Sequence, residues 1–165
     1  MKNYRDIILF PRFKNENKIQ DIRKSCDELY NCINPHITIV FPFLDDISDI
    51  ELINKVKEVV KNEKKFTIEF SGISYSDDDY IFLNCTKGNE EIIRLHDLIY
   101  NKVLKNHLSN RKYIPHITLG QIYNCTDYEK INNLTDVFKC EIDKIYVEKI
   151  GINQESIIID EISLN

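Results

Sequence analysis

The chain contains no tryptophan and no alanine, and only 4 Gly and 4 Pro among its 165 residues. So few Gly and Pro exclude collagen-like and low-complexity proteins, which are rich in one or both. The apolar runs are short, such as Ile7–Phe10 and Ile157–Ile159. None approaches the roughly 18–20 residues that a membrane span needs, and no apolar region behind the N-terminus indicates a secretory signal. We therefore expect a cytoplasmic protein that does not bind membranes.

Cysteines are odd in number, and none of them forms a CxxC pair; they are Cys26, Cys32, Cys85, Cys125 and Cys140. Without a secretory signal, reduced thiols that pack as small apolar side chains are the expected state. The acidic run Asp77–Asp79 lacks the spacing of an EF-hand, so it predicts a solvated turn and no metal site. No Gly-rich phosphate loop is present, so the sequence predicts neither NTP-driven chemistry nor a cofactor.

Charge and size narrow the class of protein further. The formal net charge is −5, which argues against a broad basic surface for duplex nucleic acid. Hydrophobic residues make up 42% and charged residues 30%, the composition of a globular chain. A chain of this length has room for one hydrophobic core. We expect a single domain over residues 1–165, acting as a monomer.

Hydrophobic periodicity predicts strand, helix, strand, helix, strand twice, followed by one more strand. The expected strands are 7–10, 36–43, 66–73, 80–85, 114–123, 140–150 and 157–164, and the expected helices are 17–30, 48–62, 89–107 and 126–138. This order predicts an α+β fold with two pseudo-symmetric lobes, each a mostly antiparallel sheet with helices on its outer face. Lobe one is expected at about 1–74 and lobe two at about 80–165, with the final strand free to cross to the other lobe.

A tetrapeptide repeat supports this duplication. Pro-His-Ile-Thr occurs at Pro35–Thr38 and again at Pro115–Thr118, at the start of the middle strand of each half. Side chains two residues apart on a strand share a face, so His36 lies beside Thr38, and His116 beside Thr118. A repeat kept only for strand entry would not need histidine. A pseudo-twofold would bring the four side chains around one small volume.

Two imidazoles and two hydroxyls suit in-line attack at a phosphodiester. A neutral imidazole can take a proton from water, and a protonated one can give a proton to a leaving sugar oxygen. The threonine hydroxyls can donate hydrogen bonds to non-bridging phosphate oxygens. None of these steps requires a metal ion. Which histidine is the acid is not decided by the pattern; for a cyclic phosphate we assign His36 as acid and His116 as base.

The two His–hydrophobic–Thr motifs resemble those of the 2H phosphoesterase superfamily, and the similarity extends over nearly the whole chain. The segment Pro35–Phe43 is similar to bacterial LigT-like and YjcG-like proteins of the 2'-5' RNA ligase family. The resemblance implies metal-independent chemistry on 2'-linked or cyclic phosphates of a nucleotide or RNA end, by hydrolysis or reversible ligation. Two alternatives remain open: degradation of cyclic di- or oligonucleotide signals with 3'-5' linkages, and an RNA-end binding module without turnover.

Residues near the motifs are candidates for substrate binding. Arg111, Lys112 and Tyr113 immediately precede the second motif, and Arg12 follows the first strand. Cations at these places would attract a phosphate despite the acidic chain, although an ordinary solvated loop explains them equally well. Gly120 shares the face of His116 and could leave room for a ligand.

Overall fold

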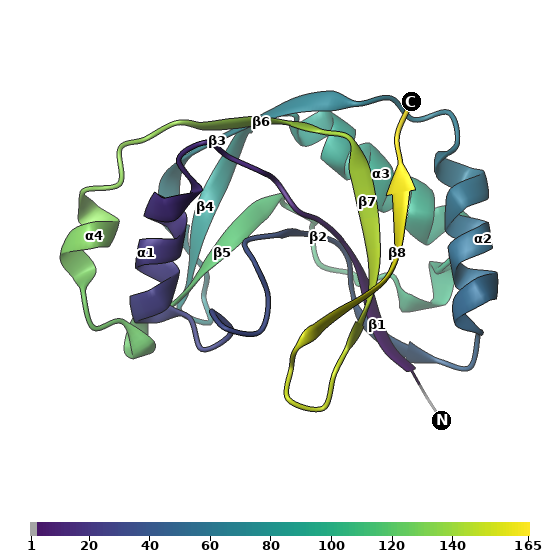
Figure 1. The fold of residues 1–165 in the computed structure, drawn as a ribbon, viewed down its shortest axis with the longest axis horizontal. Coiled ribbons are helices and arrows are strands. Elements are labelled where there is room, and N and C mark those ends of the chain that lie inside the picture. The colour runs from purple at the N-terminus through teal and green to yellow at the C-terminus, as the bar shows by residue number, and fades with distance from the viewer. Residues whose placement is uncertain (1–2) are drawn as a thin grey trace.

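A computed structural model describes residues 3–165 as two four-stranded sheets with helices on their outer faces (Figure 1). The strands are β1 (Asn3–Leu9), β2 (Ile37–Asp45), β3 (Phe66–Tyr75), β4 (Tyr80–Lys87), β5 (His116–Gln121), β6 (Phe138–Ile142), β7 (Lys144–Ile150) and β8 (Ser156–Ser163). One sheet has the order β2-β1-β7-β8 and the other β5-β4-β3-β6. All neighbouring strands pair antiparallel, so the expected bilobal α+β class is confirmed.

The two sheets do not correspond to consecutive halves of the chain. Strand β3 belongs to the expected first lobe but pairs with β4 and β6, while β7 and β8 complete the sheet of β1. The expected lobe boundary near residues 74–80 is therefore wrong. That region is only the turn of the β3–β4 hairpin, and the last two strands both return to the first sheet. Hydrophobic alternation marks a strand but carries no information about its partner.

The helices are also exchanged between the sheets. They are α1 (Glu16–Cys26), α2 (Asp49–Val60), α3 (Asn89–Lys102) and the short α4 (Tyr128–Asn132). Although α1 connects β1 to β2, it packs against β5 of the other sheet; α3 connects β4 to β5 but packs against β2. Figure 1 shows α1 and α4 on the side of β4 and β5, and α2 and α3 beside the first sheet. This exchange holds the two lobes together.

Several local predictions can be compared with the structure. The Ser48 side chain accepts a hydrogen bond from the Glu51 backbone N–H at 3.2 Å, as the capping pattern predicts. The alternation along β3 buries Ile68 and Phe70. The helix expected over 126–138 is wrong, because only α4 forms there. The strand expected over 140–150 is divided at Asp143 into β6 and β7, which belong to different sheets.

A disulfide joins Cys26, the last residue of α1, to Cys125, which follows β5. The expectation that every cysteine is a free thiol is wrong for this pair, while Cys32, Cys85 and Cys140 are free. The two bonded residues are 99 positions apart, so only the packing of α1 on β5 reveals that they meet. The backbone N–H of Thr126 also donates to the Ser25 carbonyl at 3.1 Å. The end of α1 is thus fastened to the segment after the second motif.

Two carboxyl groups are buried between β1 and β7. Asp6 and Glu148 are register partners, and each is less than 5% exposed. Glu148 accepts a hydrogen bond from the Ser156 hydroxyl. Burial, together with the neighbouring Glu148, raises the pKa of Asp6 to about 9, so this pair retains a proton at neutral pH. Charged residues inside a strand usually face solvent, so the residue pattern contains no signal that this pair is buried.

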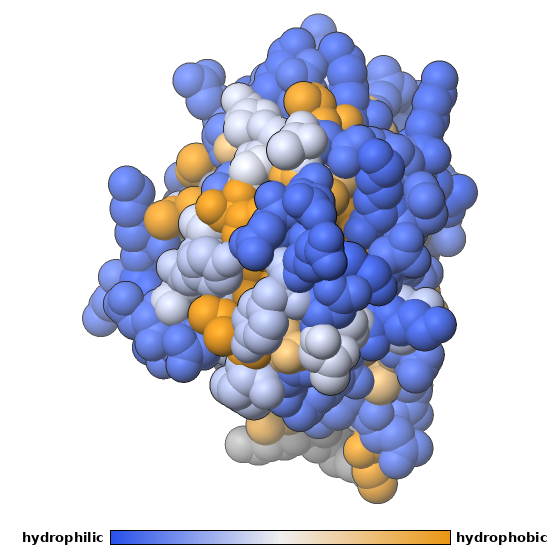
Figure 2. Space-filling model, turned by 90° about the vertical axis from the view of Figure 1, so that its left-hand side faces the viewer, coloured by the Kyte–Doolittle hydropathy of each residue, from blue (hydrophilic) through white to orange (hydrophobic). Residues whose placement is uncertain are grey.

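The outer surface matches a mainly polar chain. Figure 2 shows a largely hydrophilic surface with small apolar areas on the side where α1 and α4 lie. Within residues 3–165, no helix is both long and apolar enough to cross a lipid bilayer.

Candidate active site

Both histidine motifs lie on edge strands that meet between the lobes. Strand β2 is the outermost strand of the first sheet, β5 is the outermost strand of the second, and the two strands contact each other. His36 directly precedes β2, and His116 is the first residue of β5. The middle residue of each motif, Ile37 or Ile117, is fully buried and anchors its strand. The exchange of helices between the sheets therefore brings the two copies of the repeat side by side.

Each histidine makes the same contact with its own backbone. His36 Nδ1 lies 3.0 Å from the Asn34 carbonyl oxygen, and His116 Nδ1 lies 2.7 Å from the Ile114 carbonyl oxygen. A carbonyl oxygen can only accept a hydrogen bond, so Nδ1 carries the proton in both rings. The Nε2 atom of each neutral ring is then a proton acceptor. Both imidazoles are therefore held in one tautomer, in which Nε2 can accept a proton.

Burial controls the charge of both rings. All four motif side chains, His36, Thr38, His116 and Thr118, are half-buried. Burial lowers the pKa of His116 below its usual value of 6.5, against a smaller opposing effect of the Ile114 carbonyl. Burial also lowers the pKa of His36, against smaller opposing effects of the Asn34 carbonyl and of Asp27. The nearby charges of Arg23 and His116 lower this pKa further. The two imidazoles are thus close enough for the charge of one to act on the other.

Tyr113 connects the two motifs. Its hydroxyl donates a hydrogen bond to the Thr38 carbonyl at 2.8 Å, so a residue leading into β5 holds the backbone of β2. Its ring stacks on His96 of α3, with ring centres 3.9 Å apart and planes at 7°. Tyr113 is one of the expected substrate-binding residues, but its hydroxyl is already bonded within the protein. Its contacts make it a positioning residue that fixes one motif relative to the other.

Arg23 fixes the loop that carries the first motif. Its fully buried guanidinium donates to Asp27 at 2.8 Å, and to the Leu29 and Ile33 carbonyls at 3.4 and 2.7 Å. These contacts bind residues 27–33 to α1 just before Asn34, whose carbonyl orients His36. The residue pattern does not indicate this role of Arg23, because an arginine within an amphipathic helix is usually exposed.

The remaining predicted cations lie on the surface. The Arg111 side chain is 89% exposed and lies 4.0 Å from Asp78 in the β3–β4 turn. Lys112 is also exposed. Arg12 is exposed beyond β1, and its charge acts on Glu16 at the start of α1. None of the three makes a described contact with the histidine motifs.

Gly120 has a different role from the one expected. Its φ of +138° is strained for other residues, and a Cβ atom there would lie 2.1 Å from the Cys26 carbonyl oxygen. The space beside Gly120 is therefore filled by the backbone of α1, not by a ligand.

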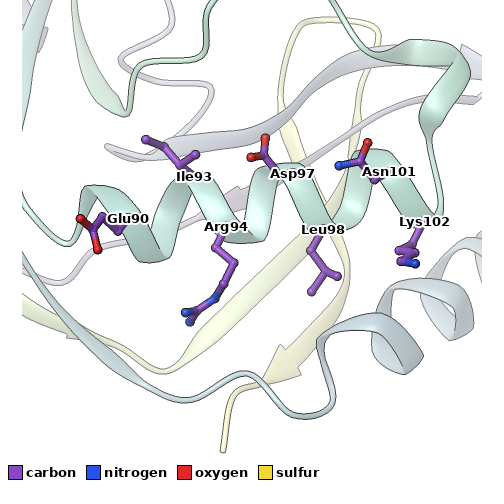
Figure 3. A pocket seen from close by; sticks show the side chains of 7 residues that line it. All are labelled: Glu90, Ile93, Arg94, Asp97, Leu98, Asn101 and Lys102. Carbon is purple, nitrogen blue, oxygen red and sulfur yellow. The ribbon is translucent and has the colours of Figure 1, made fainter.

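A surface hollow of about 390 Å³ lies away from the motifs, along the solvent side of α3. Figure 3 shows that its walls are side chains of this one helix, from Glu90 to Lys102. The hollow has no residue from β2 or β5. Among the described residues, no three His, Cys, Asp or Glu side chains group as a metal site would require.

Comparison with known proteins agrees with this architecture. A family model described as the 2'-5' RNA ligase superfamily matches residues 10–150. A protein of Bacillus pumilus is 28% identical over 117 residues, which cover 70% of this chain and 68% of that protein. A Geobacillus protein is 29% identical over 134 residues, covering 76% and 73%. Both are named "Putative phosphoesterase".

Solved structures share the fold at low sequence identity. Escherichia coli LigT, complexed with 3'-AMP, superposes with a TM-score of 0.67 at 12% identity, over 100% of this chain and 99% of that chain. A Thermus thermophilus protein also superposes with a TM-score of 0.67 at 12% identity, over 98% and 97%.

Proposed function

Since the chain belongs to the 2'-5' RNA ligase superfamily, we propose that it is a phosphoesterase that cleaves an RNA-type phosphodiester involving a ribose 2'-oxygen. The substrate is a 2',3'-cyclic phosphate or a 2'-5' linkage, and ligation is the reverse reaction. One observation carries this proposal: both repeated histidines have Nδ1 bonded to the carbonyl two residues earlier, leaving Nε2 available beside a threonine. The nucleotide in the E. coli LigT complex supports the substrate class.

The proposed reaction uses only groups of this chain. Neutral His116 accepts a proton from water at Nε2, and the water oxygen forms a bond to phosphorus. Protonated His36 gives its Nε2 proton to the sugar oxygen as the bond from phosphorus to that oxygen breaks. The hydroxyls of Thr38 and Thr118 donate to the non-bridging oxygens and stabilise the charge that develops there. The products are a phosphomonoester and a free sugar hydroxyl.

The proposal is tested by an HPLC product assay on a small panel of substrates, with EDTA present and absent. The panel holds nucleoside 2',3'-cyclic phosphates, 2'-5' and 3'-5' dinucleotides, and cyclic di- and trinucleotides. We expect turnover of a cyclic phosphate or a 2'-5' linkage, unchanged by EDTA because the proposed proton transfers need no metal ion. Turnover of only the cyclic oligonucleotides would replace the proposal with degradation of a signal. Binding without product would indicate an RNA-end binding module.

The pH dependence of kcat/KM should be bell-shaped, with its maximum below pH 6.5. The reaction needs one protonated and one neutral imidazole, and burial lowers both pKa values from 6.5 in the free protein. As the pH rises through these lowered values the acid is lost, and as it falls through them the base is lost. The bound anionic phosphate favours the imidazolium, so the kcat profile should lie at higher pH. A kcat/KM maximum above pH 7 would contradict this assignment.

A further inference from the structure

We propose that Tyr80 and Phe82 on β4 form a stacking surface for a nucleobase of the substrate, beside His116. The inference rests on the proposed function, because it places one part of the substrate relative to the phosphate. It adds a requirement that the two histidines alone do not impose: the substrate carries a base on the side of His116.

The strand register places these rings on the face of the motif. Asn84 is directly opposite His116, and Phe82 is directly opposite Thr118. Register partners share a face, and side chains alternate along a strand, so Tyr80 also lies on this face. The residues between them, Ile81 and Leu83, are fully buried on the opposite face. The aromatic surface therefore begins at the catalytic pair of the second motif and continues along β4.

The two rings follow one another along β4, starting at the second motif. The Phe82 ring packs on the His116 imidazole, with ring centres 3.8 Å apart and planes at 32°. The Tyr80 ring is parallel to Phe82 within 7°, with centres 6.2 Å apart. Tyr80 is 39% exposed and Phe82 is half-buried, so neither ring is enclosed in the core. Aromatic rings that remain accessible beside a phosphate-binding group are the usual platform for an unpaired base.

Within residues 3–165, no parallel pair of rings like Tyr80 and Phe82 lies beside the first motif. The nearest ring to His36 is Phe10, whose centre is 6.5 Å away at an angle of 70°. Phe10 in turn meets Tyr146 edge-on at 5.0 Å, and Tyr146 is only 6% exposed. Both ring pairs therefore meet edge to face, and neither is parallel as Tyr80 and Phe82 are. The asymmetry assigns the base to the side of His116 and β4.

Stacking recognises the flat face that every base has, so this surface accepts different bases and favours the larger purines. It also separates nucleotides from phosphodiesters that lack a base, such as phosphosugars. A ligand pair that differs only in the base tests this directly.

The experiment is a calorimetric titration of the full chain with adenosine 3'-phosphate and with ribose 3-phosphate. We expect the wild type to bind the adenosine compound about 5- to 150-fold more tightly, the range for stacking of one base. In Phe82→Leu and in Tyr80→Leu, this ratio should fall at least fivefold, because leucine keeps an apolar side chain but removes the ring. Tyr80→Leu is the cleaner of the two, since Tyr80 has no ring contact with His116 among the described residues.

Tyr75→Leu is the matched control. Tyr75 is an exposed tyrosine on the neighbouring strand β3, but its register partner is Ile81, so it lies on the opposite face. In Tyr75→Leu, the ratio of the affinities for the two ligands should equal that of the wild type. Equal binding of the two ligands by the wild type, no binding of either ligand, or an unchanged ratio in both leucine variants would each overturn the inference. The titration measures binding and needs no turnover. If the wild type prefers the adenosine compound as expected but cleaves none of the substrates, the stacking surface stands and the proposed catalysis is rejected.

Discussion

Replacing either His36 or His116 with alanine should lower the rate of phosphodiester cleavage by about 10²–10⁴-fold, the usual contribution of one general acid or base. In the proposed mechanism each imidazole transfers a proton through Nε2, while its Nδ1 is bonded to a carbonyl. Alanine removes the proton carrier. It leaves the buried anchors Ile37 and Ile117 in place, so the fold should remain intact. The measurement is kcat for the substrate that the panel identifies, with thermal unfolding as the test of folding.

The double variant gives a further test. Because the two histidines act in one proton-transfer sequence, we expect their effects to be far from additive. The matched control is His107→Ala, which removes a histidine that contacts Asp45 and Phe43 outside the motifs. It should retain the wild-type rate. A rate within threefold of wild type in folded His36→Ala or His116→Ala would reject two-histidine catalysis.

Gly120→Ala should destabilise the protein by about 2–5 kcal/mol, because it combines backbone strain with overpacking. The residue has φ +138°, and its new Cβ would lie 2.1 Å from the Cys26 oxygen and 2.3 Å from the Cys26 carbonyl carbon. The backbone of Cys26 has little freedom to move away. The Cys26–Cys125 disulfide and the hydrogen bond from Thr126 to Ser25 hold it against β5. The free energy of unfolding by urea measures the effect.

Gly151→Ala is the matched control for this substitution. Its new Cβ would meet the end of the Glu155 side chain, which can rotate away with the loss of one exposed hydrogen bond from the Asn153 N–H. We expect a loss below about 1 kcal/mol there, in the range of an ordinary surface change. Reduction of the disulfide should weaken the effect of Gly120→Ala, since α1 could then move. Equal stability of Gly120→Ala and wild type would show that α1 does not approach β5 this closely.

Much of the candidate site could be predicted from the sequence because its evidence is local. His36 and Thr38 are two residues apart, as are His116 and Thr118. Side chains alternate along a strand, so each pair shares one face. The capping pattern at Ser48 and the alternation along β3 depend on neighbouring residues in the same way. These interactions extend over a few positions only, so the residue pattern itself specifies them.

Which distant segments meet is visible in the folded chain alone. The exchange of α1 and α3 between the sheets, the pairing of β7 with β1, and the Cys26–Cys125 bond each join residues far apart in the chain. The same holds for the Tyr113 hydroxyl on the Thr38 carbonyl and for the Phe82 ring beside His116. Such contacts depend on sheet order and helix packing, which hydrophobic periodicity does not encode. The residue pattern therefore specifies the chemical groups of the repeat, whereas the packing of the two lobes specifies what surrounds them.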